Sequence, residues 1–240
     1  MKKRILELSM AMLLLLGAFV LSRQVASYVE AMQSPIEQKE AMQTYVEQKI
    51  VVIDAGHGGQ DPGKVGVNNV LEKDINLKIA LELKTLLEEQ NVKVVLTRDT
   101  DEGLNDADAS NKKIQDMTRR VEIIDETSPD LVVSIHQNSY QEESVKGPQV
   151  FYYTHSVQAQ TLAEIIQEQL NTDLAIERPR MAKANDSYYL LKKTEGTTVI
   201  VECGFLSNSE EEQLLNQEDY QKKLAISIKD GIMSYLNNNL

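Results

Sequence analysis

Short apolar runs rich in β-branched residues alternate with helical patterns from residue 50 onward, and this alternation constrains the fold more than any other feature. The runs lie at residues 50–54, 92–97, 131–136, 149–154 and 198–203. Apolar residues recur at helical spacing over 75–87, 162–170 and 224–236. Strands that are apolar on both faces and separated by helices predict an α/β domain, with a mostly parallel, twisted sheet of about six strands and helices on both faces.

The first residues have the pattern of an export segment. A basic start, residues 1–4, is followed by an almost unbroken apolar run over 8–21. That run is shorter than the roughly 20 residues of a typical membrane-spanning helix. We therefore predict a signal peptide or membrane anchor over 1–23, with the rest of the chain exported and extracytoplasmic.

A polar stretch separates this segment from the predicted domain. Within residues 24–49, a ten-residue unit at 30–39 is repeated with changes at 40–49. Two copies are too few for a solenoid, and Pro35 interrupts any helix. These features predict a linker over 24–49 and one catalytic domain over 50–240.

Composition excludes several classes of function. Among 240 residues, 25 Lys and Arg face 37 Asp and Glu, which gives a net charge of −12. An acidic chain lacks the basic face of a non-specific nucleic-acid binder, so no nucleic-acid partner is expected. The single Cys rules out an internal disulfide and any zinc site with several thiolates. Three His leave few candidates for a metal site.

Chemically suggestive residues follow the predicted strands, where functional groups of parallel sheets gather. His57 lies in a glycine-rich turn, His136 closes an apolar strand, and Glu202 ends another. Glu72 lies at the start of a predicted helix. Singly, each of these residues is explained by structural hydrogen bonding or by the helix dipole. Together, two His and one Glu form a common ligand set of catalytic zinc, and a further Glu can act as general base.

Several motifs in order resemble the zinc-dependent N-acetylmuramoyl-L-alanine amidases of bacterial cell walls, the amidase type 3 family, over residues 50–240. They are residues 52–59, Glu72, residues 96–98, Arg120, residues 134–138 and residues 201–208. The stretch 188–193 is most similar to the subgroup that modifies the spore cortex for germination. The chain departs from the family at Gln137, where many members have Ala, and at Asp125, where many have Asn.

The resemblance implies a site and a reaction. His57, Glu72 and His136 would hold Zn²⁺, and Glu202 would be the catalytic carboxylate. The bond cut would join the lactyl group of N-acetylmuramic acid to L-alanine in peptidoglycan, as a step towards muramic δ-lactam. Glu202 would take a proton from water and pass it to the departing amine. No recognisable nucleophile motif such as G-x-S-x-G is present in the sequence.

Further residues are weaker candidates for substrate binding. Arg98 and Arg120 suit either substrate carboxylates or structural ion pairs, and Asn138 and Arg180 are also candidates for substrate contact. The short segment 100–117 leaves little room for the inhibitory helix of some relatives. Control by a regulatory envelope protein or by the timing of expression is therefore a hypothesis. Contact with a membrane is expected only through the N-terminal segment.

Two other functions and three local interpretations complete the expectations. A zinc peptidase acting on stem peptides is one alternative, and a non-catalytic wall-binding module is the other. His155 is interpreted as a surface or capping residue, and Cys203 as a buried, unreactive thiol on the face opposite Glu202. The acidic run 209–212 suits the start of a helix capped by Ser207 or Ser209.

Overall fold

The computed structural model describes residues 12, 17–27 and 48–238. The chain divides into two units, residues 1–47 and 48–240. In the first unit, residues 17–27 are helical. Most of the predicted export segment and most of the predicted linker lie outside the described residues. No helix in the described part is both long and apolar enough to cross a membrane.

The second unit is built on a six-stranded sheet with the order β2-β1-β3-β6-β4-β5. The strands are β1 (Ile50–Ala55), β2 (Lys93–Leu96), β3 (Leu131–Asn138), β4 (Gln149–Tyr152), β5 (Lys183–Ala184) and β6 (Thr198–Phe205). Neighbouring strands are parallel, except that β4 is antiparallel to β6. The predicted, mostly parallel sheet of about six strands is therefore confirmed. Only β5, two residues at the edge, was absent from the apolar pattern.

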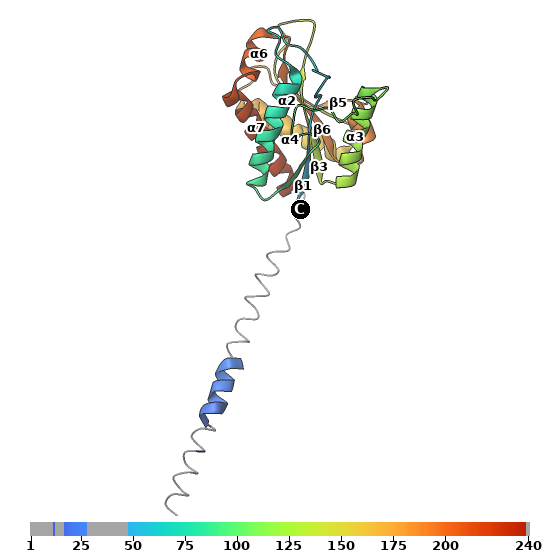
Figure 1. Cartoon of the computed structure of the whole chain (residues 1–240). Coiled ribbons are helices and arrows are strands. Elements are labelled where there is room, and N and C mark those ends of the chain that lie inside the picture. Colours follow the sequence, from blue (N-terminus) through green and yellow to red (C-terminus); the bar gives the residue numbers. More distant parts are fainter. Residues whose placement is uncertain (1–11, 13–16, 28–47, 239–240) are drawn as a thin grey trace, which may run out of the picture. The chain divides into compact units, whose positions relative to one another are not determined.

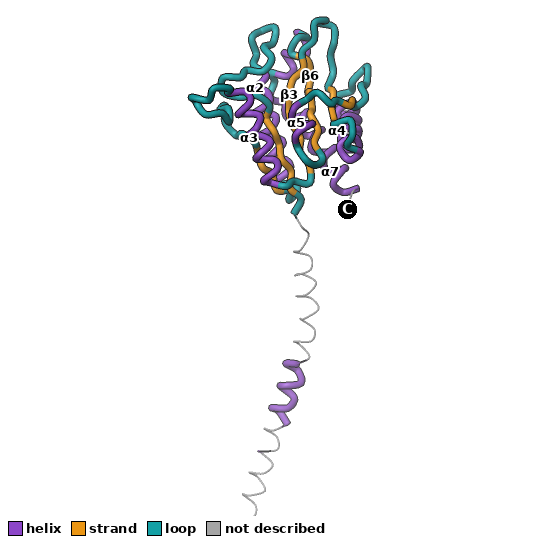
Figure 2. Tube along the Cα trace, turned by 90° about the vertical axis from the view of Figure 1, so that its right-hand side faces the viewer, coloured by secondary structure: helices purple, strands orange, loops and turns teal. Residues whose placement is uncertain are grey.

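Helices cover both faces of this sheet (Figure 1), as the sequence predicts. The helices are α2 (Glu72–Glu88), α3 (Lys112–Thr127), α4 (Val157–Asp173), α5 (Tyr189–Lys193), α6 (Ser209–Leu215) and α7 (Glu218–Asn238). The main core lies between the sheet and α2, α4 and α7. The short helix α5 and α3 lie on the other face, onto which Figure 2 looks.

Alternation along the strands decides which side chains reach which face. Ile53, Val133 and Val201 belong to the main core beneath α2, α4 and α7. Val52 and Val132 point the other way and pack with buried residues of α3 and α5. Because only α3 and one short helix cover that second face, polar residues at the ends of its strands stay accessible. This incomplete cover makes room for a site.

Helix α3 was not identified from the sequence, although apolar residues recur along it at helical spacing. Its described residues include only two buried ones, Arg120 and Ile124. Arg120 is 1% exposed and contacts Asp54 at 2.6 Å and Asp116 at 2.7 Å. The inner face of α3 is therefore part ionic and part apolar, with Met117 and Val121 packed beside Ile124.

The start of α6 also differs from expectation. Asn208, rather than Ser207 or Ser209, is the N-cap, and its side-chain oxygen accepts from the backbone N–H of Glu211. Glu211 and Glu212 are buried, so the acidic run is not simply a solvated helix start. Glu211 accepts from the backbone N–H groups of Gly147 at 2.7 Å and Phe205 at 2.8 Å. It therefore ties the loop before β4 to the end of β6.

We expect Asp54→Asn to lower the free energy of unfolding by about 3 kcal/mol, because it removes one partner of a buried ion pair. Asp54 is 2% exposed and also accepts from the hydroxyls of Thr97 at 2.8 Å and Ser134 at 2.6 Å. Urea unfolding of the wild type and variant measures the loss. Glu88→Gln removes an exposed pair with Lys84, and we expect it to cost less than about 0.5 kcal/mol.

Acid unfolding tests the same pair. Burial would raise the pKa of Asp54, but the charge of Arg120 and hydrogen bonds from Ser134 and Thr97 together lower it to about 2. A depressed pKa stabilises the fold above the unfolded value of about 4, and this contribution is lost as the pH falls towards 2. Unfolding of the Asp54→Asn variant should depend less on pH in that window. An unchanged acid profile would contradict this assignment.

Candidate metal centre and active site

A glycine-rich turn after β1 places His57. The strand ends at Ala55, and His57 itself has a left-handed backbone with φ of 63°. A Cβ added at Gly56 would lie 2.3 Å from Cε1 of His136. Only glycine therefore lets the His136 ring approach this turn. The rings of His57 and His136 meet edge to face, with their centroids 5.0 Å apart.

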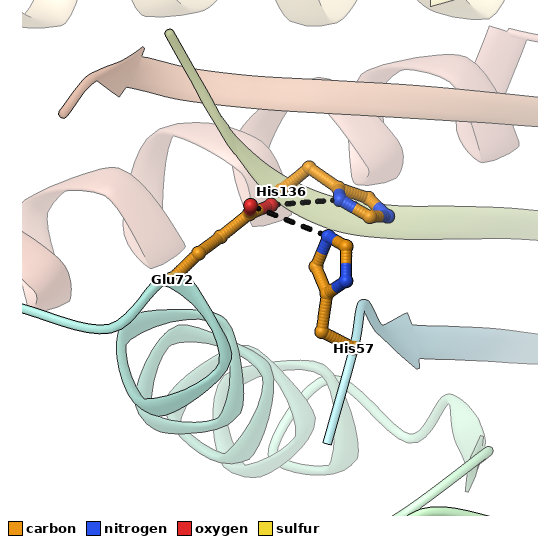
Figure 3. A group of neighbouring side chains, drawn as sticks. All are labelled: His57, Glu72 and His136. Carbon is orange, nitrogen blue, oxygen red and sulfur yellow. Dashed lines mark hydrogen bonds and ion pairs between the residues drawn. The ribbon is translucent and has the colours of Figure 1, made fainter. Parts of the chain in front are cut away.

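Glu72, the first residue of α2, points its carboxylate towards both rings (Figure 3). Its Oε1 lies 2.9 Å from Nδ1 of His136, and its Oε2 lies 3.2 Å from Nε2 of His57. The carboxylate is also held by the backbone N–H groups of Lys64, at 2.7 Å, and Gln137, at 3.0 Å. Glu72 is only 2% exposed, so its position is fixed from several directions.

The charges of this cluster are tightly coupled. Burial would raise the pKa of Glu72, but hydrogen bonds from His136 and His57 lower it well below its usual range. Burial would lower the pKa of His136, but the hydrogen bond and charge of Glu72 raise it to about 9. The carboxylate thus supplies the negative charge that a buried cation at this position requires.

The cluster fits a zinc ion. One ligand atom from each of His57, Glu72 and His136 lies within 4.8 Å of the others. Two imidazole nitrogens and one carboxylate oxygen are the donors of many catalytic zinc sites, in which a fourth position stays open for water or substrate. Among the described residues, no other group of this kind occurs. The three residues predicted as ligands from the sequence are therefore the three that the fold brings together.

Polar residues hold these three side chains in place. Asp61 contacts Nδ1 of His57 at 3.0 Å, which leaves Nε2 of that ring turned towards Glu72. Behind Glu72, the amide of Asn76 lies 3.4 Å from Oε1 and accepts from the amide of Gln137 at 3.2 Å. Partners of this kind fix the tautomer and direction of metal-binding side chains.

We expect Asp61→Ala to weaken zinc binding by about 10- to 100-fold, because His57 loses the acceptor that fixes its tautomer. Competition with a chromogenic chelator measures the affinity. Asp61→Asn keeps one of the two oxygen acceptors that His57 and the backbone N–H of Gly63 use, so its loss should be smaller. Equal affinities for the wild type and Asp61→Ala would contradict the orienting role.

Glu202 lies beside the cluster on the neighbouring strand. It pairs in register with His136, so both side chains point to the sheet face that α3 and α5 cover. Its Oε1 lies 3.4 Å from the hydroxyl of Tyr188, while Oε2 is buried without a hydrogen-bond partner. Burial raises the pKa of Glu202, although the charge of His136 opposes the rise. A carboxylate with one unpaired oxygen and a raised pKa is suited to accept a proton.

All four residues line one pocket of about 470 Å³. The same pocket is bordered by Lys64, Lys113, Asn138 and the aromatic pair Tyr188 and Tyr189. The pocket therefore combines a candidate metal ligand set and the carboxylate of Glu202 with aromatic and cationic side chains in its walls. That combination is suited to the hydrolysis of a polar substrate.

Residues 51–234 match the family model described as N-acetylmuramoyl-L-alanine amidase. The chain belongs to this amidase family. The germination-specific N-acetylmuramoyl-L-alanine amidase of Bacillus subtilis (strain 168) is 36% identical over 190 residues, which cover 78% of this chain and 79% of the relative. The expectation of family membership is therefore confirmed.

Solved structures of amidases share the fold. The CwlD amidase from Clostridioides difficile, in complex with the GerS lipoprotein, has a TM-score of 0.77 and 38% identity, covering 79% of this chain and 99% of that one. The catalytic domain of CwlV from Bacillus (Paenibacillus) polymyxa var. colistinus has a TM-score of 0.70 and 31% identity, with coverage of 79% and 99%. The described α/β domain is therefore an amidase fold over nearly its whole length.

Two of the four predicted substrate-binding residues have structural positions in this amidase fold. Arg98 is 5% exposed and donates to the backbone carbonyls of Ala55, Gly56, Lys73 and Thr100. Arg120 donates to the carbonyls of Ala55 and His57 besides its two carboxylate partners. Their donors are used to brace the turn that carries His57. These contacts favour a structural role for both arginines, but Arg120 also lines the pocket, and substrate contact by either one stays a prediction.

The other two predicted substrate-binding residues lie in different places. Asn138 lines the pocket, which keeps substrate contact by its side chain a prediction. Arg180 does not line it. Instead, Arg180 donates to the backbone carbonyl of Lys146 and stacks over the ring of Phe205, with 5.1 Å from its central carbon to the ring centroid.

The two residues interpreted as bystanders behave as expected. Cys203 is fully buried on the opposite face from Glu202, and burial raises the pKa of its thiol. His155 is exposed beside Tyr153, and the neighbouring Ser156 caps α4. Sequence reasoning assigned no role to Asp61, Asn76 or Tyr188. Asp61 lies four residues after His57 in the same turn, and this closeness in the sequence is the signal that could have identified it.

Proposed function

We propose that this chain is a zinc-dependent amidase that hydrolyses the bond between the lactyl group of N-acetylmuramic acid and L-alanine in peptidoglycan. The observation that carries the proposal is the meeting of His57, Glu72 and His136 in one pocket with the unpaired oxygen of Glu202. Family membership supplies the bond and the substrate. A zinc ion held by the three ligands would polarise the scissile carbonyl and lower the pKa of water.

The chain's own residues account for the proton transfers. Oε2 of Glu202 accepts a proton from the attacking water, whose oxygen forms a bond with the lactyl carbonyl carbon. The carbon–nitrogen bond then breaks, and Glu202 passes the proton to the nitrogen of L-alanine. The products are a muramic acid carboxylate and a free stem peptide. Asp61 and Asn76 hold two of the ligands in position throughout.

Peptidoglycan digestion tests this function. Zinc-loaded protein should release free stem peptides that begin with L-alanine and should create new muramic acid carboxylates, both detectable by mass spectrometry. A zinc peptidase would instead shorten isolated stem peptides, and a non-catalytic wall-binding module would sediment with peptidoglycan without changing it. Either of those results, without release of complete stem peptides, would overturn the proposal.

The biological setting that we propose is maturation of the spore cortex. The germination-specific amidase of Bacillus subtilis and the CwlD amidase of Clostridioides difficile support this role by their similarity. In that setting, removal of stem peptides prepares muramic acid for conversion to δ-lactam. Absence of muramic δ-lactam from the cortex of a deletion strain, and its return on complementation, would test the assignment.

Residues 1–49 have a proposed role in delivering the catalytic domain. A signal peptide or anchor over 1–23 and a linker over 24–49 would place residues 50–240 outside the cytoplasm. Fractionation of cells and N-terminal sequencing of the exported protein would test export and cleavage. Recovery of full-length protein in the cytoplasm alone would contradict export.

A regulatory envelope protein is the proposed partner. The CwlD amidase was solved in complex with the GerS lipoprotein, and this complex supports an envelope partner for the present chain. The test is the activity of purified protein with zinc alone. Full activity without any added protein would exclude an activating partner.

A further inference from the structure

Tyr188 is held in place beside the site by contacts of its backbone and ring. It precedes α5, and its backbone N–H donates to the side-chain oxygen of Asn185 at 3.0 Å. The ring packs edge to face on Phe151, with centroids 5.4 Å apart, against the small cluster of Phe151, Leu191 and Ile200. These contacts fix the ring and leave the hydroxyl in the pocket wall.

That hydroxyl contacts one oxygen of the proposed base. It lies 3.4 Å from Oε1 of Glu202, and no other described side chain forms a hydrogen bond with this carboxylate. Oε2 is buried and has no partner at all. The two oxygens of Glu202 therefore differ in their surroundings, and Tyr188 is the residue that makes them different.

We propose that Tyr188 is a positioning residue for Glu202 in the hydrolysis, an inference that rests on the proposed function. Its hydroxyl donates to Oε1, holds the plane of the carboxylate, and leaves Oε2 as the oxygen that accepts the proton of water. The 3.4 Å separation is long for a bond between a hydroxyl and a carboxylate, and such contacts tighten when substrate is bound. Tyr188 touches neither the metal ligands nor the scissile bond in this scheme.

Strand pairing fixes the backbone of Glu202 but not the direction of its carboxylate. Glu202 is fixed through its backbone by pairing with β3 and β4. The last torsion of a glutamate side chain is broad, so the strand alone does not determine how the two oxygens point. One hydrogen bond at Oε1 removes that freedom. A base held in the productive direction gains rate through orientation rather than through substrate binding.

The test compares Tyr188→Phe with Tyr153→Phe in zinc-loaded, full-length protein. Tyr153 packs against the same cluster but does not line the pocket, so it controls for the loss of a hydroxyl there. We expect Tyr188→Phe to lower kcat by about 10- to 100-fold, with KM and zinc content unchanged. Tyr153→Phe should match the wild type. A higher KM at unchanged kcat, or no change, would overturn the inference.

A double-mutant cycle with Glu202→Gln separates this role from direct action on substrate. If Tyr188 works only through Glu202, Tyr188→Phe should cause no further loss in that background. A loss of the same fold-change in both backgrounds would show that the hydroxyl acts elsewhere. Wild-type protein that releases no stem peptide would overturn the proposed function, and the inference with it. Normal wild-type turnover with an equal kcat for the Tyr188→Phe variant would overturn the inference alone.

Discussion

Glu202→Gln is expected to lower kcat for stem-peptide release by about 10²- to 10⁴-fold, the usual contribution of general acid–base catalysis. The amide keeps the size and position of the side chain but cannot accept the proton of water. Zinc content should remain that of the wild type, because Glu202 is not among the three ligands. The measurement is initial rates on soluble muramyl peptide at saturating zinc.

Stability measurements make this prediction specific. Burial raises the pKa of Glu202, so its ionised form opposes folding at neutral pH. In metal-free protein, Glu202→Gln should therefore unfold at an equal or higher urea concentration than the wild type. Glu211→Gln is the matched control. Burial raises the pKa of Glu211 as well, but each of its oxygens accepts from a backbone N–H away from the pocket, and an amide keeps only one of these two acceptors. We expect that variant to lose about 1–3 kcal/mol of stability and to keep its kcat.

Glu72→Gln is expected to abolish activity through loss of the metal. Glu72 is the anionic member of the ligand set and contacts both imidazoles. Loss of a residue that only supports a metal ligand weakens metal affinity by up to roughly 100-fold. Replacement of Glu72, itself a proposed ligand, should weaken zinc binding by more than that. Metal analysis after dialysis against a weak chelator measures occupancy. Activity should fall to that of wild-type protein treated with a strong chelator.

Glu88→Gln provides the control for this substitution. Glu88 is the last residue of the same helix, exposed and paired only with Lys84 in the described structure. Zinc content and kcat of that variant should equal those of the wild type. If Glu72→Gln retained both zinc and activity, the ligand set proposed here would be incorrect.

Much of the fold followed from apolar periodicity, because the central strands are buried on both faces. β1, β3 and β6 are continuous apolar runs, and their order along the chain predicts parallel neighbours. The same reasoning could have identified α3, but it could not show that Arg120 is buried and paired with Asp54. Nor could it identify β5, which has only two residues and no apolar pattern.

The site was predictable to a similar extent. His57, Glu72, His136 and Glu202 were recognisable by residue type, motif and position at strand or helix ends. The supporting residues were not, because their roles depend on distances across the chain. Tyr188 reaches Glu202 over 14 residues, and Gln137 reaches Asn76 over 61. Arg98 and Arg120 show a different limit of the sequence. Their motif positions were recognisable, but a motif position does not reveal that a side chain is buried.

The pairing of His136 with Glu202 makes the active site depend on strand register. Successive side chains of a strand point to opposite faces, so a shift of one residue in β6 would turn Cys203 towards the pocket and Glu202 into the main core. The same shift would bring apolar residues out of that core. A misaligned sheet would thus lose its base and its stability together. Correct folding and catalytic competence therefore both depend on the register between β3 and β6.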